Sequence, residues 1–142
     1  MRRIPRYLMV PILALVLAFA AAGCSSDVAT SPTDTTTPTT ITDEFAGTIG
    51  VNGAATHTFT VNQAGSVTAT LVSVSPDDTI RVGFSLGTWN GASCQTVLSR
   101  DAAVVGNAIV GATTSGGVLC VRVYDIGQIV EPTDYQIRAV HQ

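Results

Sequence analysis

Residues 57–72, "HTFTVNQAGSVTATLV", carry the pattern that decides the fold. On both sides of the central "NQAGS", every second residue is Thr or Ser. The positions between them form one face on each side: His57, Phe59 and Val61, then Val67, Ala69 and Leu71. A period of two indicates half-buried antiparallel strands, and Asn, Gly and Ser between them indicate a turn. The stretch therefore predicts two strands joined by a turn.

The same alternation recurs further along the chain in three more runs: "IRVGFSL" (80–86), "LCVRV" (119–123) and "YQIRA" (135–139). In the first run we expect Ile80, Val82, Phe84 and Leu86 to face inward, and Arg81, Gly83 and Ser85 to face outward. Turn residues break the chain at 51–54, 62–66, 75–78, 89–93, 115–117 and 131–134. The "NG" at 52–53, between two strand-like runs, is typical of a β-hairpin.

The fold class predicted for residues 43–142 is all-β, because no window there shows a helical period with capping residues. We expect about eight strands in a single antiparallel β-sandwich of the jelly-roll or immunoglobulin-like type.

Residues 1–23 have the organisation of a secretory signal, with basic "MRRIPR", then the uncharged run 7–22, then small residues. A transmembrane anchor is the alternative, but the run is shorter than the roughly 20 apolar residues that a spanning helix needs, and Pro11 interrupts it. The final "AAGC" resembles the lipobox of bacterial lipoproteins, although Ala21 stands where Leu is commoner.

The lipobox resemblance implies that Cys24 is lipidated and becomes the mature N-terminus, usually with an added acyl chain such as palmitate. Two or more acyl chains anchor a protein stably, whereas one does so only marginally. The chain would then be exported and tethered to the membrane through Cys24. Ser25 is not the Asp that retains some lipoproteins at the inner membrane, which favours the outer membrane if there are two. The alternative is a plain secretory cleavage site with an incidental thiol.

Residues 24–42 form the predicted tether, rich in Thr, Ser and Pro and too poor in apolar side chains to fold. From Cys24 onward the sequence has four arginines and ten acidic residues, and the whole chain contains no lysine. Nucleic acid is therefore excluded as a partner, because phosphate binding needs clustered cations.

Cys94 and Cys120 are the two other cysteines, and in an exported chain such a pair predicts a disulfide. A metal site would need further ligands at closer spacing, and a redox pair would need C-x-x-C. Cys24 is the cysteine left over, which supports lipidation.

Residues 44–141 resemble the bacterial pre-peptidase C-terminal domain family, β-sandwich modules attached to exported proteins. The motifs are "GTIGVNGAATHTFTV", "AGSVTATLVSVSPDDTIRVGFSLG", "LCVRVYDIG" and "DYQIRAV". Leu119 stands where an aromatic residue is common, and no catalytic domain precedes the module in this sequence. The resemblance implies a non-catalytic module that binds polymers or assists an exported partner.

Few residues could carry chemistry. We expect His57 to be an edge or core residue, and His141 to be a solvated chain end. Asp77 and Asp78 could act as an acid–base pair or bind calcium, but adjacent acids in a turn usually cap it, and no metal or cofactor is predicted. Four polar or aromatic residues are candidates for a ligand site: Trp89, Asn90, Gln95 and Tyr124, the last next to Asp125. The favoured alternative for Trp89 is that its side chain covers the end of the sandwich core.

The function expected is therefore non-catalytic: a cell-envelope lipoprotein that displays a binding or structural β-sandwich. The alternative is a carbohydrate-binding module in which Trp89 stacks on a sugar. A lower alternative is a hydrolase, or a hydrolase accessory, using His57 and an Asp. Possible partners are the membrane, a glycan or an envelope protein.

Overall fold

A computed structural model of the chain describes residues 39–142, which form eight β-strands. The strands are β1 (Ile41–Ile49), β2 (Ala54–Val61), β3 (Gly65–Ser75), β4 (Val82–Trp89), β5 (Cys94–Ala103), β6 (Ala108–Thr113), β7 (Gly117–Tyr124) and β8 (Thr133–His141). The described part contains no helix, and so none that could span a membrane. The predicted all-β class is confirmed. The signal, Cys24 and the tether up to residue 38 lie outside the described residues.

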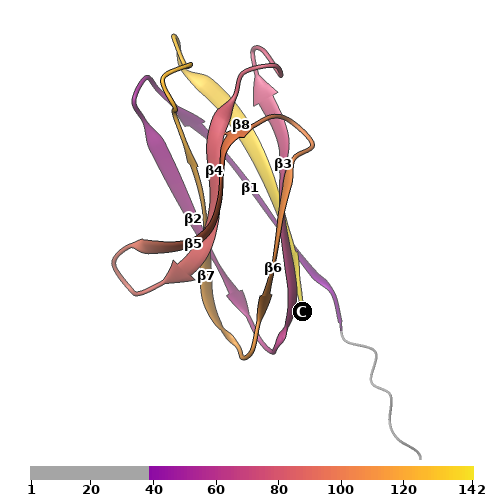
Figure 1. The fold of residues 1–142 in the computed structure, drawn as a ribbon. Helices are drawn as coiled ribbons and strands as arrows, with labels where there is room; N and C mark the ends of the chain where they lie inside the picture. Colours follow the sequence, from indigo (N-terminus) through magenta and orange to yellow (C-terminus); the bar gives the residue numbers. More distant parts are fainter. Residues whose placement is uncertain (1–38) are drawn as a thin grey trace, which may run out of the picture. The chain divides into compact units, whose positions relative to one another are not determined.

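The strands form two four-stranded antiparallel sheets packed face to face (Figure 1). One sheet has the order β1-β8-β3-β6 and the other the order β2-β7-β4-β5. The first strand pairs with the last, the second with the seventh, the third with the sixth and the fourth with the fifth. This is the nested arrangement of an eight-stranded jelly roll. The predicted β-sandwich of about eight strands is confirmed, and its first strand begins at Ile41.

The predicted hairpin at the "NG" of 52–53 is wrong. The tight turn does form, with Asn52 at φ 54° and the Gly53 N–H donating to the Gly50 carbonyl at 2.9 Å. The strands on either side of the turn belong to different sheets, however, because β1 pairs with β8 and β2 with β7. Local turn chemistry bends the chain, but burial of both apolar faces between the sheets decides where each strand goes. Among the described strands only β4 and β5 form a sequence-adjacent pair.

The core lies between the sheets and consists of the side chains on the predicted inward faces. Val67, Ala69 and Leu71 of β3 are at most 1% exposed. They face buried residues of the other sheet, such as Phe84 of β4 and Val121 of β7. The alternation in the sequence therefore identified these inward positions correctly, because a pleated strand sends successive side chains to opposite faces.

The outward face of β4 departs from the prediction, since Gly83 and Ser85 are buried rather than exposed. The Tyr124 ring lies directly over Gly83, where a Cβ would come within 2.0 Å of it. Further along β4, the start of β5 folds over Gly87. The outward face of β4 is therefore covered by Tyr124 and by the start of β5, while its inward face lies in the core.

Candidate functional site

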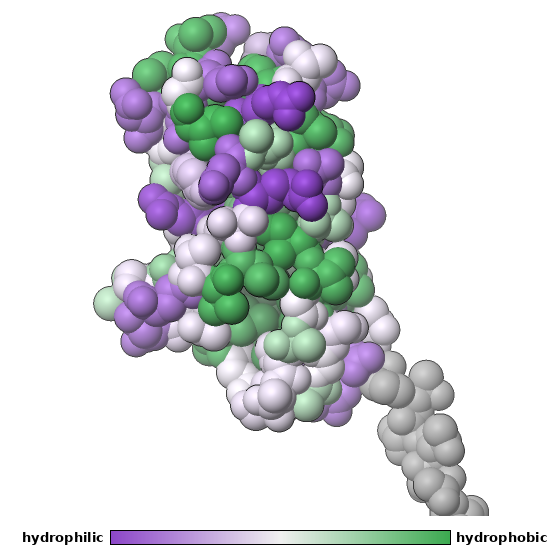
Figure 2. All heavy atoms as spheres, in the orientation of Figure 1, coloured by the Kyte–Doolittle hydropathy of each residue, from purple (hydrophilic) through white to green (hydrophobic). Residues whose placement is uncertain are grey.

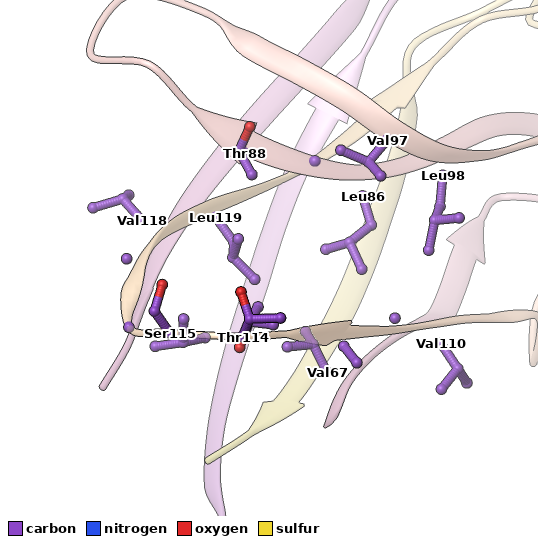
Figure 3. A pocket seen from close by; sticks show the side chains of 17 residues that line it. Val67, Leu86, Thr88, Val97, Leu98, Val110, Thr114, Ser115, Val118 and Leu119 are labelled. Carbon is purple, nitrogen blue, oxygen red and sulfur yellow. The ribbon is translucent and has the colours of Figure 1, made fainter. Parts of the chain in front are cut away.

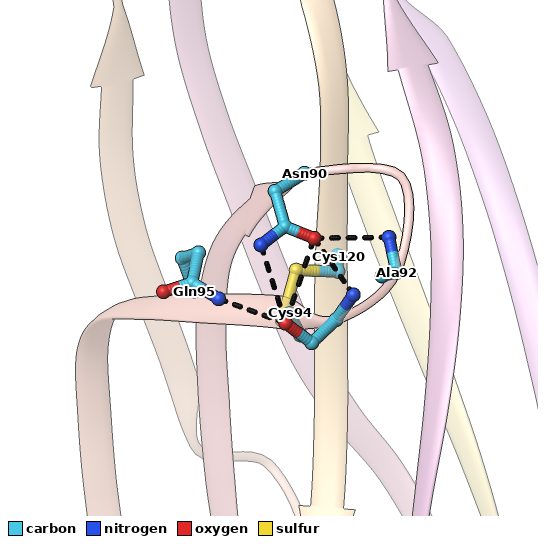
Figure 4. The surroundings of a disulfide bond; sticks show 6 residues. Asn90, Ala92, Cys94, Gln95 and Cys120 are labelled. Atoms are coloured by element: carbon cyan, nitrogen blue, oxygen red, sulfur yellow. Dashed lines mark hydrogen bonds between the residues drawn. A yellow bond between two sulfur atoms is a disulfide. The ribbon is translucent and has the colours of Figure 1, made fainter.

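Cys94 at the start of β5 and Cys120 in β7 form a disulfide, as predicted, with Cα atoms 5.8 Å apart (Figure 4). The bond holds the β4–β5 hairpin, which projects from the sandwich in Figure 1, against the outer face of its own sheet. Gly87 permits this close approach, because a Cβ there would lie 2.1 Å from the Gln95 carbonyl oxygen.

The predicted ligand residues Trp89, Asn90 and Gln95 lie together at this hairpin. Trp89 is the half-buried last residue of β4. The Asn90 side-chain oxygen accepts hydrogen bonds from the backbone N–H groups of Ala92 and Ser93, at 2.9 and 2.8 Å. The Gln95 amide donates to the Ser93 hydroxyl at 2.8 Å. Both amides therefore stabilise the turn (Figure 4).

Tyr124, the fourth predicted ligand residue, is the last residue of β7, four residues beyond Cys120. Its register partner on β4 is Gly83, six residues before Trp89, a separation of roughly 20 Å along a strand. Its hydroxyl donates to Asp101 at 2.9 Å, and Arg122 lies over its ring. Burial, followed by the bond to Asp101, raises the Tyr124 pKa. The structure thus separates Tyr124 from the Trp89 group.

His57 is half-buried where β1 and β2 face each other, in agreement with its expected place at an edge of the core. Its ring stacks on Phe45 with centroids 4.9 Å apart, and its Nε2 shares a 2.7 Å hydrogen bond with the Tyr135 hydroxyl. Burial lowers the pKa of His57. Its hydrogen-bond partner is thus a phenol rather than a carboxylate.

The prediction that His141 is a solvated chain end is wrong, because the side chain is fully buried. It is the last residue of β8, whose pairing with β1 carries it into the sandwich beside the Phe59 ring. Its Nε2–H donates to the Asp43 carboxylate at 2.9 Å. The pairing of β8 with β1, about 100 residues earlier in the chain, accounts for the burial. The position of His141 near the end of the sequence does not reveal this pairing.

Two acidic side chains, Asp77 and Asp125, cap turns. Asp77 accepts hydrogen bonds from the Thr79 hydroxyl and N–H, which lower its pKa. Asp125 accepts from the N–H of Asn52, at 2.9 Å, and from three N–H groups of its own loop, those of Gly127, Gln128 and Ile129. The bond from Asn52 is the main cause of its lowered pKa. Within residues 39–142, no three His, Cys, Asp or Glu side chains are grouped so as to hold a metal ion.

A large hollow in the described region has no counterpart among the predictions from the sequence. It is a groove of about 750 Å³ where the edge strands β5 and β6 of the two sheets face each other (Figure 3). Val67, Leu86 and Leu119 are among the residues inside it. Figure 2 shows an apolar patch on this side of the molecule. We call this hollow the β5–β6 groove.

Two properties of the β5–β6 groove define its chemistry. Its 17 lining residues are all aliphatic residues, Gly, Thr or Ser, so none of them is ionisable at neutral pH. Four of the six large apolar side chains that are exposed in the described region line it: Val97, Leu98, Val110 and Val118. The only signal in the sequence is the run of small residues 111–117, "GATTSGG", of which residues 115–117 alone are predicted as a turn.

No protein-family model matches the chain, and no curated protein matches it either.

Proposed function

We propose that this chain is an exported lipoprotein, anchored through Cys24, whose β-sandwich acts by binding rather than by catalysis. The observation that carries the binding role is the β5–β6 groove, a hollow of about 750 Å³ that has no ionisable side chain in its lining. General acid–base or nucleophilic catalysis needs such a group within hydrogen-bond reach of the substrate. An apolar groove of this size instead suits ligand binding, for which pockets are typically about 300–1,000 Å³.

The cysteines support export. Two of the three form the Cys94–Cys120 disulfide, a bond that persists in oxidising compartments outside the cytosol. The remaining cysteine is Cys24, directly after the apolar run and "AAG". The resemblance to the pre-peptidase C-terminal family belongs to the same proposal, supported by the quoted motifs and the β-sandwich fold.

Labelling with radioactive palmitate in a bacterium that processes lipoproteins tests the anchor. We expect the chain to take up label and sediment with membranes, and Cys24→Ala to lose both properties. The control is the double variant Cys94→Ala/Cys120→Ala, which removes the other thiols and should keep the label. Wild type without label, or a Cys24→Ala variant that still sediments with membranes, contradicts the anchor.

Carbohydrate binding through Trp89 is the second candidate. It is supported by the position of this half-buried indole beside an exposed, disulfide-held turn, where an aromatic face can stack on a sugar. A glycan array tests it: binding by wild type that Trp89→Ala loses supports the role. An array without signal, or one unchanged by the substitution, removes it.

A further inference from the structure

Strand β6 is a sheet edge without the usual protection against pairing. Among the described strands it pairs only with β3, so the backbone N–H and C=O groups along its other edge have no strand partner. Native edge strands are commonly protected by charges, prolines or bulges. The sequence of β6, "AIVGAT", has no charge and no proline, and its pairing with β3 runs without a register shift.

The other three edges are protected or covered. Strand β1 carries Asp43 and Glu44. Strand β5 carries Arg100 and Asp101, and its register with β4 shifts twice. Strand β2 has no charge, but it lies against β1, where Phe45 stacks on His57. Strand β6 is thus the edge in this domain that is both open and uncharged.

The β5–β6 groove runs beside this free edge. Gly111 of β6 lies in its lining, and a Cβ there would meet only the tips of Leu98 and Leu86, at 3.2 and 3.4 Å. The only polar side chains in the lining are the hydroxyls of Thr and Ser. A small polar ligand would therefore find little to orient it, whereas a peptide backbone would find a row of hydrogen-bonding groups along β6.

We propose that β6 and the β5–β6 groove form a docking site for an extended, uncharged segment of another protein. The segment adds as a strand to β6 and places alternate apolar side chains in the groove, against Leu86 and Leu98. Strand addition of this kind takes affinity from backbone hydrogen bonds and specificity from pockets for every second side chain. The six residues of β6 fit a segment of roughly 20 Å.

Charge points to the same class of partner. Four arginines and eight acidic residues lie in the described region, and all of them lie outside the groove lining. A charged segment would lose hydration in the groove without gaining an ion pair, so an apolar, uncharged one is favoured. The inference rests on the proposed binding role of the domain and does not depend on the lipid anchor.

The first test is selection from a display library of random nine-residue peptides on the immobilised full chain. We expect enriched peptides to carry apolar residues at alternate positions and no charge between them. No enrichment, or enriched sequences without a period of two, overturns the proposal. The Cys24→Ala chain should bind the same peptides with unchanged affinity, so failure of the anchor and failure of the docking site give different results.

Variants then locate the site. Val97→Lys places a charge in the groove lining, and Gly111→Val fills it; each should weaken binding of the best peptide at least tenfold. The matched control is Val130→Lys, because Val130 is 87% exposed and lies outside the groove lining; it should change affinity less than twofold. If Gly111→Val fails to fold, Val97→Lys still tests the docking site, because Val97 is 68% exposed and a lysine there should leave the fold intact. Equal affinities for Val97→Lys and Val130→Lys overturn the proposal.

Backbone pairing is tested with the same peptide N-methylated at alternate residues, in both phases. We expect one phase to bind at least tenfold more weakly, and the unmodified peptide to slow hydrogen exchange of β6 amides. If both N-methylated peptides bind like the parent, strand addition is overturned. Analytical ultracentrifugation of the chain without peptide tests whether a second copy of the chain occupies the groove instead. A dimer that Val110→Lys dissociates would show that it does, and would also overturn the proposal.

Discussion

The two lateral openings of the sandwich differ in how they are filled. At the closed side, where β1 faces β2, the rings of Phe45, His57, Phe59 and His141 lie within 6.2 Å of a neighbouring ring. At the open side, where β5 faces β6, small residues and exposed valines border the β5–β6 groove. Both sides have the same topology, so side-chain size decides which opening packs as core and which remains a surface.

The largest expected effect comes from removing a ring at the closed side. Phe59→Ala should lower the free energy of unfolding by about 3–5 kcal/mol, because Phe59 is only 5% exposed and a cavity would remain. Urea denaturation measures the change. The open-side counterpart Val97→Ala should change it by less than about 0.5 kcal/mol. Similar losses for the two variants would contradict the distinction between the sides.

The disulfide should have the next largest effect. Replacing both cysteines by Ala should lower the unfolding free energy by about 3 kcal/mol, since the bond closes a loop with a sequence separation of 26 residues. Chemical denaturation of the oxidised protein and the double variant gives the difference. Addition of a reductant should destabilise wild type and leave the double variant unchanged. A reductant that destabilises both proteins would argue against the Cys94–Cys120 disulfide as the source of the stabilisation.

A smaller, pH-dependent effect is expected from His57. Burial lowers its folded-state pKa below the usual 6.5, so the unfolded chain binds the proton more readily. The folded state is therefore favoured most above pH 6.5, where His57 is neutral in both states. This contribution to the free energy of unfolding is lost as the pH falls through the folded-state pKa of His57. Unfolding midpoints between pH 7.5 and 5 should fall less for His57→Gln than for wild type. Parallel pH profiles would exclude His57 as the source.

The smallest effect on stability is expected at the open side. Val97→Lys and Val110→Lys should each change the unfolding free energy by no more than about 0.5 kcal/mol, because both side chains are about two-thirds exposed. Thermal and urea unfolding measure this. A loss of several kcal/mol at either position would show that the groove is part of the core and not a surface.

Much of the fold could be predicted from local pattern. Val67, Ala69 and Leu71 were assigned to the inward face correctly, because strand geometry alone sets the alternation. The Cys94–Cys120 pairing followed from counting cysteines in a chain interpreted as exported. Of the candidate site, the grouping of Trp89 with Asn90 and Gln95 followed from closeness in sequence, whereas Tyr124 lies elsewhere.

The sequence by itself thus determined the all-β class, the inward faces of the alternating runs and the pairing of cysteines, since each depends on residue type and short-range spacing. Only the tertiary structure decided strand neighbours, which turned the "NG" at 52–53 into a crossing between sheets and buried His141 against Asp43. It also decided that β5 and β6, which belong to different sheets although only residues 104–107 separate them in the chain, leave a groove between them. Burial is a property of neighbours brought together from distant parts of the chain, and a one-dimensional pattern does not contain it.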